Sequence, residues 1–273
     1  MIKKCLENVR NTSPLVHNIT NYVTVNDCAN ILLAIGASPI MSDEIEDVVD
    51  ITKICTGLNI NIGTLNKNTI GSMFKAGKIS NDLDHPVLLD PVGVGASNLR
   101  TNTAKELIEK IQFSVIRGNI SEIKALINGS GKTKGVDANV SDVVTKDNLD
   151  EVVKFAKEFS LKTNSIIAIT GAIDIVADSN KAYCIYNGNP MMSKITGTGC
   201  QLSALTTAFI CANKDNMLEA TASAIISMGV CGEIAYQRLN KLDGNSSYRN
   251  YIIDAIYNLS SDDLEKMSKY EIR

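Results

Sequence analysis

The sequence predicts an α/β protein, with a mainly parallel sheet and helices on both of its faces. Helical and extended patterns alternate from Asn26 to Tyr186, as they do in chains built from repeated β–α units. The run Val87–Asp90 is apolar, ends in a carboxylate and precedes Pro91, which is typical of a buried parallel strand. After Tyr186 the pattern is helical almost throughout.

Short apolar runs bounded by turn residues predict the strands. Two of them, Ile173–Ala177 and Ala182–Tyr186, are separated by Asp178-Ser179-Asn180 and therefore predict an antiparallel hairpin. The other predicted strands are Ala37–Met41, Leu58–Ile62, Val87–Asp90, Phe113–Ile116 and Ser165–Ile169. Because the carboxyl ends of parallel strands are where such sheets bind ligands, Met41, Asp90, Arg117 and Thr170 become candidate site residues.

Apolar residues at three- and four-residue spacing predict the helices. Thr103 and Glu106 match a capping box and predict a helix that begins there and continues to about Ile111. The other predicted helices are Asn26–Ile35, Glu44–Cys55, Asn66–Ala76, Ser121–Asn128, Leu149–Phe159, Leu202–Ala212 and Met217–Leu239. The last of these could line an interface or be buried within one subunit.

Composition favours a soluble globular protein, and one domain, residues 1–273, is expected since no long linker or internal repeat divides the chain. The formal net charge of -3 disfavours a nucleic-acid or anionic-membrane partner. The N-terminus has no apolar signal segment, and the most apolar stretch, Ala222–Ala235, is too short to span a bilayer. We expect a cytoplasmic protein, in which seven scattered cysteines without a Cys-x-x-Cys pair remain reduced.

Histidine is scarce, with only His17 and His85 in the chain. This excludes a multi-histidine metal centre and disfavours a histidine general base. A divalent metal would have to be a hard ion held by carboxylates, which indicates magnesium rather than zinc.

The most informative motif is the glycine-rich turn Lys194-Ile195-Thr196-Gly197-Thr198-Gly199-Cys200, which leads directly into an apolar helix. Such a turn aims several backbone N–H groups at one point, and the helix dipole adds to their field. We therefore expect it to bind phosphate and to stabilise developing negative charge.

Three other motifs fail on spacing. Gly129-Ser130-Gly131-Lys132-Thr133 lacks the first glycine of a phosphate-binding Walker loop, because Leu126 stands in that place. Gly93-Val94-Gly95 begins a dinucleotide fingerprint, but Asn98 replaces its third glycine. A Gly-x-Ser-x-Gly nucleophile elbow is absent from the sequence, which disfavours an α/β-hydrolase.

The glycine-rich turn resembles the anion hole of ribokinase-like kinases, in which an aspartate follows the second glycine as the catalytic base. Cys200 stands at that position here, a departure that hydroxyethylthiazole kinases share. Further segments resemble that family in order along the chain: Val16–Asn21, Gly36–Ser42, Leu89–Ala96, Ile116–Ile123 and Ile169–Gly171 with Asp174.

The resemblance implies a ribokinase-like three-layer α/β/α sandwich with no separate lid domain. It implies phosphorylation of a thiazole alcohol by ATP with Mg²⁺, in a homotrimer whose active sites lie between subunits. The implied roles are acceptor contact for Asn21, Met41 and Gly197, ATP contact for Arg117, Asn119, Thr170, Thr198 and Gly199, magnesium for Asp90 and Glu122, and catalysis for Cys200.

These residue types suit phosphoryl transfer, which needs positioning, a metal and charge neutralisation more than covalent chemistry. Asp90 and Glu122 are hard oxygen ligands, and Arg117 offers a planar fork to phosphate oxygens. A free thiol has a pKa of about 8.5. The helix N-terminus and a nearby magnesium ion would favour the thiolate of Cys200, which could accept the proton of the attacking hydroxyl.

Three alternatives remain open on the sequence. The acceptor could be another small alcohol, such as a hydroxymethylpyrimidine. The protein could be an ATP- or ADP-dependent dehydratase acting on hydrated nicotinamide cofactors, as some ribokinase-like proteins are. A non-catalytic binding paralogue should have lost Arg117, Asp90 or the Gly-Thr-Gly turn, and all three are present.

Overall fold

The computed structural model describes residues 1–127 and 143–273. These residues form one nine-stranded sheet with helices packed against it. The strand order is β2-β1-β3-β4-β5-β6-β7-β8-β9. Strands β2 to β6 in this order are parallel, and β7, β8 and β9 extend the sheet in antiparallel fashion. The strands are β1 Leu15–Ile19, β2 Ser38–Met41, β3 Gly57–Asn61, β4 Val87–Asp90, β5 Val115–Asn119, β6 Ile166–Thr170, β7 Asp174–Ala177, β8 Ala182–Ile185 and β9 Tyr270–Ile272.

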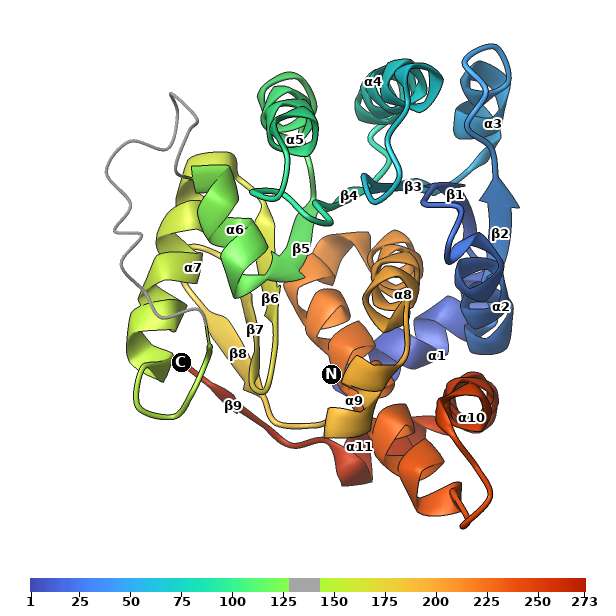
Figure 1. Ribbon diagram of the computed structural model, residues 1–273, viewed down its shortest axis with the longest axis vertical. Helices are drawn as coiled ribbons and strands as arrows, with labels where there is room; N and C mark the ends of the chain where they lie inside the picture. Colours follow the sequence, from blue (N-terminus) through green and yellow to red (C-terminus); the bar gives the residue numbers. More distant parts are fainter. Residues whose placement is uncertain (128–142) are drawn as a thin grey trace.

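Helices cover both faces of the sheet, which confirms the predicted three-layer α/β/α arrangement (Figure 1). One layer contains α3 Val48–Ile54, α4 Lys67–Asp82, α5 Asn98–Lys110, α6 Ile120–Ile127 and α7 Leu149–Thr163. The other contains α1 Ile2–Thr12, α2 Val25–Ile35, α8 Thr198–Ala212, α9 Met217–Arg238, α10 Asn245–Asn258 and α11 Ser261–Met267.

The alternation of side chains along each strand divides the core into two parts. On β4, Val87 and Leu89 pack against the α3–α7 layer, while Leu88 packs against the layer that contains α8. Asp90, the next residue, therefore faces α8, because successive side chains of a strand point to opposite faces. By the same alternation Asn61 on β3 and Arg117 on β5 also face α8.

The helices α8 and α9 are apolar nearly all round because they are enclosed by the sheet and by other helices. Every residue of α8 from Cys200 to Ile210 is buried. The stretch Lys214–Arg238 is long and apolar enough to cross a membrane by composition, yet 78% of its apolar window is buried inside the protein. Of the two alternatives for this segment, burial within one chain describes most of α9.

Several predicted boundaries were wrong. Thr103 does not cap a helix, since α5 begins five residues earlier at Asn98 and Ser97 accepts the backbone N–H of Arg100. Thr103 instead lies within α5, where its side chain is buried. Strand β5 also extends through Arg117 to Asn119, beyond the predicted end at Ile116.

Short elements that pair with distant segments were not predicted. No strand was predicted at β1, and the last third of the chain was predicted to be helical, whereas β9 pairs with β8 through Tyr183 and Ile272. The predicted hairpin of β7 and β8 is confirmed. The rejected Walker-like segment Gly129–Thr133 and Asn128, the predicted end of α6, lie outside the described residues.

The start of α4 gives a stability test. Asn66 accepts the backbone N–H groups of Asn68 and Thr69, and the hydroxyl of Thr69 accepts the backbone N–H of Asn66. Asn66→Ala removes this cap and should lower the free energy of unfolding by about 1 kcal/mol in urea denaturation. The matched control is Asn68, which is exposed and lies two residues after Asn66. Asn68→Ala should change the free energy of unfolding by less than about 0.5 kcal/mol. Equal effects of the two substitutions would contradict the cap.

Candidate active site

Four neighbouring parallel strands bring polar side chains together at the carboxyl edge of the sheet. The register pairs Asn61 at the end of β3 with Asp90 at the end of β4. It also pairs Asn119 of β5 with Thr170 at the end of β6. Arg117 lies two residues before the end of β5 and reaches toward both of these pairs.

Asp90 is fully buried and lies at the centre of this group. Its Oδ2 accepts hydrogen bonds from Asn61 Nδ2 at 2.8 Å, from Ser203 Oγ at 2.8 Å and from Arg117 Nη1 at 3.3 Å. Its Oδ1 is buried and has no partner. Burial raises the pKa of Asp90 above its usual range, while the charge of Arg117 and the donors Ser203 and Asn61 oppose that rise.

Arg117 is held by three elements. Besides Asp90, its guanidinium donates to Thr170 Oγ1 at 2.8 Å and to Ser203 Oγ at 3.5 Å. Its Nε is buried without a partner. A buried Arg–Asp pair with further hydrogen bonds is rigid, so the fork is held in place before any ligand arrives.

Glu122 is committed to the backbone. Its Oε2 accepts the N–H of Asn119 and its Oε1 accepts the N–H of Gly93, both at 2.9 Å, while Asn119 Oδ1 accepts the N–H of Glu122. Glu122 therefore connects the loop after β4 to the start of α6. Asn119 is exposed and acts as the partner of Glu122 in this cap.

The glycine-rich turn begins α8, as the motif predicted, and the helix starts at Thr198 rather than Leu202. Gly197 is its N-cap in the left-handed region, at φ 89°, which glycine adopts without a steric penalty. A Cβ on Gly197 would lie 2.5 Å from Thr24 Cγ2, and one on Gly199 would lie 2.9 Å from both terminal nitrogens of Arg117. Both glycines thus permit close approach, and Gly199 places the start of α8 directly on the guanidinium.

Cys200 lies in the first turn of α8 and is 9% exposed. Its Sγ accepts hydrogen bonds from Asn21 Nδ2 at 3.1 Å and from Asn61 Nδ2 at 3.3 Å. Burial and then the charge of Asp90 raise the pKa of the Cys200 thiol, while Asn21 and Arg117 oppose that rise. In the protein itself this rise disfavours the thiolate, and the thiolate expected at the helix N-terminus beside magnesium stays a prediction.

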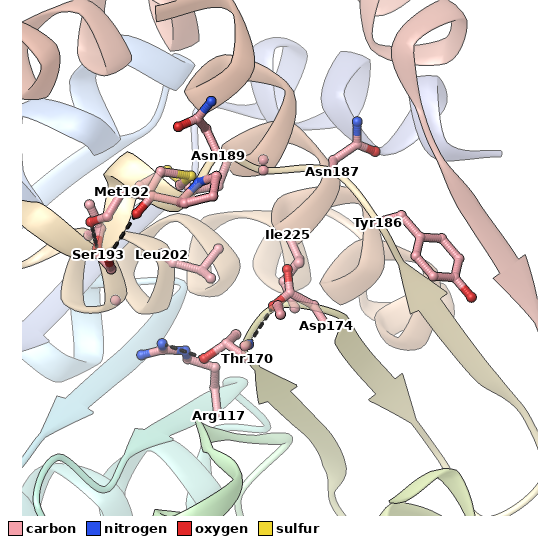
Figure 2. Close-up of a pocket in the computed structure, with 18 residues that line it drawn as sticks. Arg117, Thr170, Asp174, Tyr186, Asn187, Asn189, Met192, Ser193, Leu202 and Ile225 are labelled. Carbon is pink, nitrogen blue, oxygen red and sulfur yellow. Dashed lines mark hydrogen bonds between the residues drawn. The ribbon is translucent and has the colours of Figure 1, made fainter. Parts of the chain in front are cut away.

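A cavity of about 520 Å³ opens above Arg117 and Thr170 (Figure 2). Thr198 and Gly199 line it at the start of α8, and Asp174 and Tyr186 line it on the β7–β8 side. Asp174 accepts the N–H of Gly171 at 2.8 Å, and burial raises its pKa to about 7. The cavity is large enough for a nucleotide and has the arginine fork and helix N-terminus at one end.

A second cavity of about 150 Å³ lies beside β1, β2 and β3. Met41, Met73 and Tyr22 give it apolar walls, and Asn18 and Asn61 supply amides. Buried His17 contacts one of the residues that line this cavity, since its Nε2 lies 2.9 Å from the carbonyl oxygen of Ser42. Burial lowers the pKa of His17, so the neutral ring donates its Nε2–H to that carbonyl.

The structure brings most of the sequence-predicted residues together, in two groups. Arg117, Thr170, Thr198 and Gly199 line the larger cavity, and Met41 lines the smaller one. The remaining candidates support these groups: Asn21 and Asp90 hold other side chains, Gly197 caps α8, and Glu122 and Asn119 cap α6.

Two residues of the cluster were missed, Asn61 and Ser203. Asn61 is the last residue of β3, so the strand-end rule that selected Asp90 would also have selected it. Ser203 lies three residues after Cys200 on the same face of α8. The sequence does not reveal the role of its hydroxyl, because that role depends on the packing of α8 against β4.

Comparison with known proteins shows which family this chain belongs to. The model of the hydroxyethylthiazole kinase family matches residues 6–262. A hydroxyethylthiazole kinase of Clostridium acetobutylicum is 67% identical over 271 residues, which cover 99% of each chain, and one of Clostridium beijerinckii is 53% identical, covering 98% of this chain and 96% of the relative. The solved structure of a hydroxyethylthiazole kinase from Pyrococcus horikoshii superposes with a TM-score of 0.88 at 34% identity, covering 100% of this chain and 98% of that one.

The N-cap of α8 gives a second stability test. Gly197→Ala forces a side chain into the left-handed region and against Thr24, so the free energy of unfolding should fall by at least about 1–2 kcal/mol. Gly244 caps α10 with extended backbone, and a Cβ there meets nothing within 4 Å. Gly244→Ala should therefore cost no more than about 0.5 kcal/mol. A Gly197→Ala protein as stable as this control would contradict the close approach.

Proposed function

Because the chain belongs to the hydroxyethylthiazole kinase family, we propose that it transfers the γ-phosphoryl group of ATP to the hydroxyl of 4-methyl-5-(2-hydroxyethyl)thiazole. The product is the thiazole phosphate used in thiamine biosynthesis or salvage. Residues 1–273 act as one domain in this proposal, since a single sheet supplies both halves of the site.

The observation that carries the proposal is that the immediate neighbours of Cys200 border both cavities. Thr198 and Gly199, just before it, line the larger cavity, while Asn61, which donates to its sulfur, lines the smaller one. A phosphoryl donor in the larger cavity and an alcohol in the smaller one would therefore meet at the start of α8. Transfer between two bound substrates requires such a meeting point.

The donor side fits ATP through charge. The guanidinium of Arg117 and the free N–H groups at the start of α8 converge where the phosphates would lie. Thr170 orients the guanidinium through its hydroxyl. These donors are fixed before binding, so they would stabilise the charge on the transferred group without reorganising.

Asp90 and Glu122 fit Mg²⁺ in different ways. The buried Oδ1 of Asp90 has no partner and is a hard oxygen of the kind that magnesium or its bound water prefers. Both oxygens of Glu122 already accept backbone N–H groups. We therefore assign Glu122 to holding the loop after β4 in place and to contacting the magnesium ion through water. A bound magnesium ion would neutralise phosphate charge and offset the field of Asp90 on Cys200.

The acceptor side assigns the proton to Cys200. The hydroxyl of the thiazole alcohol would lie near Sγ, which two amide donors already orient. Met41 and Tyr22 would pack against the ring from the smaller cavity. Asn21 takes part by donating to Cys200 Sγ, and Gly197 takes part by leaving the space that Thr24 fills beside the turn.

We also propose a cytoplasmic homotrimer with active sites between subunits, and no nucleic-acid or membrane partner. The family resemblance supports the trimer, and so does Tyr22, which lines the smaller cavity and is 78% exposed, with its neighbour Val23 58% exposed. Apolar side chains at the mouth of a site are expected where a second subunit completes it.

A coupled assay tests the function. The protein with ATP, Mg²⁺ and the thiazole alcohol should release ADP and form a phosphorylated thiazole, at a rate well above a control without acceptor. Hydroxymethylpyrimidine, tested beside it, should react much more slowly. Phosphorylation of the pyrimidine alone would overturn the acceptor, and silence from a folded protein that binds ATP would favour a dehydratase or a binding protein.

Substitution of Cys200 tests the proton acceptor. Cys200→Asp should remain an active kinase, because a carboxylate can accept the same two amide donors and the same proton. Cys200→Ala should lower kcat by roughly 100-fold or more, as is usual when a general base is removed. If both variants fold and are equally inactive, Cys200 does not act as the base.

A further inference from the structure

Asn61 is the most completely bonded side chain of the site. It ends β3, is 1% exposed and faces α8. Its Nδ2 donates to Asp90 Oδ2 at 2.8 Å and to Cys200 Sγ at 3.3 Å. Its Oδ1 accepts Asn21 Nδ2 at 3.1 Å and the backbone N–H of Gly63 at 2.9 Å. All four sites of the amide are therefore used.

The backbone fixes which way this amide points. The N–H of Gly63 can only donate, so the atom of Asn61 that faces it must be the oxygen. The nitrogen then faces Asp90 and Cys200, and both of these are acceptors. The assignment of oxygen and nitrogen thus follows from the hydrogen-bond network.

The two partners depend on Asn61 to different degrees. Asp90 Oδ2 keeps two other donors, Ser203 and Arg117, if Asn61 is removed. Cys200 keeps only Asn21 among the amides that reach its sulfur. The amide of Asn21 is itself held by Asn61 Oδ1, so loss of Asn61 removes one donor from Cys200 and loosens the other.

We propose that Asn61 is a positioning residue that fixes the Cys200 sulfur relative to the Asp90 carboxylate. It couples the end of β3 to the start of α8 and so determines where the acceptor hydroxyl would lose its proton. What the sulfur does for the hydroxyl rests on the proposed function. The placement of the sulfur rests on the hydrogen bonds alone.

A double-mutant cycle tests the coupling. Asn61→Ala should lower kcat for thiazole phosphorylation by roughly 10- to 100-fold, the size expected when a hydrogen bond to a charged group is lost. The KM for ATP and for the thiazole should change by less than about threefold. In a Cys200→Ala protein the same substitution should lower kcat by less than about threefold, because the sulfur it positions is gone.

Asn59 provides the matched control. It lies two residues earlier on β3, is buried on the same face and donates to Asn18 Oδ1 at 3.0 Å. Asn59→Ala should leave kcat within about threefold. An equal loss from Asn61→Ala with and without Cys200, or a raised thiazole KM with kcat intact, would overturn the proposal.

A chemical measurement separates this proposal from the kinase function. Asn61→Leu keeps the branching and the number of heavy atoms of the side chain and removes its two N–H donors and its acceptor oxygen. The rate at which iodoacetamide alkylates Cys200, read from its peptide by mass spectrometry, should fall about tenfold, because the thiolate form that reacts loses a hydrogen-bond donor. It should not change in Asn59→Leu. A rate that is unchanged or faster in Asn61→Leu contradicts the positioning role, even if the protein proves to phosphorylate nothing.

Discussion

The buried ion pair between Asp90 and Arg117 constrains most of this structure. Both side chains are taken from water at the carboxyl edge of the sheet, and such burial is unfavourable unless the two charges are paired and further hydrogen bonds stabilise them. The partners come from β3, β6 and α8, as Asn61, Thr170 and Ser203. Strand order and helix position must therefore be correct together, which makes the pair a strong determinant of a unique fold.

The same pair leaves specific atoms unsatisfied, and these are where chemistry is expected. Asp90 Oδ1 and Arg117 Nε have no partner, although nearly all buried polar atoms in proteins have one. The glycines of the α8 turn remove side chains that would fill the space above them. The site thus combines a rigid frame with a few groups reserved for a metal ion, phosphates and an alcohol.

The sequence predicted the local patterns well and the distant partners poorly. The apolar run Val87–Asp90 and the turn at Gly197 carry their structure in a few neighbouring residues, and both were confirmed. Strand β9 depends on pairing with β8 some ninety residues away, and Ser203 gains its role only from packing on β4. Thr103 was predicted as a cap because its spacing to Glu106 matches a capping box, whereas Ser97 is the residue that caps α5.

The central claim is that Asp90 and the start of α8 hold a magnesium–ATP complex facing the acceptor cavity. A crystal structure with Mg²⁺, a non-hydrolysable ATP analogue and the thiazole alcohol tests it most directly. The account predicts magnesium or its water on Asp90 Oδ1, the terminal phosphate between Arg117 and the backbone of Gly199, and the alcohol oxygen beside Cys200 Sγ. A nucleotide in the larger cavity with its phosphates away from Arg117, or an alcohol bound elsewhere, would contradict it.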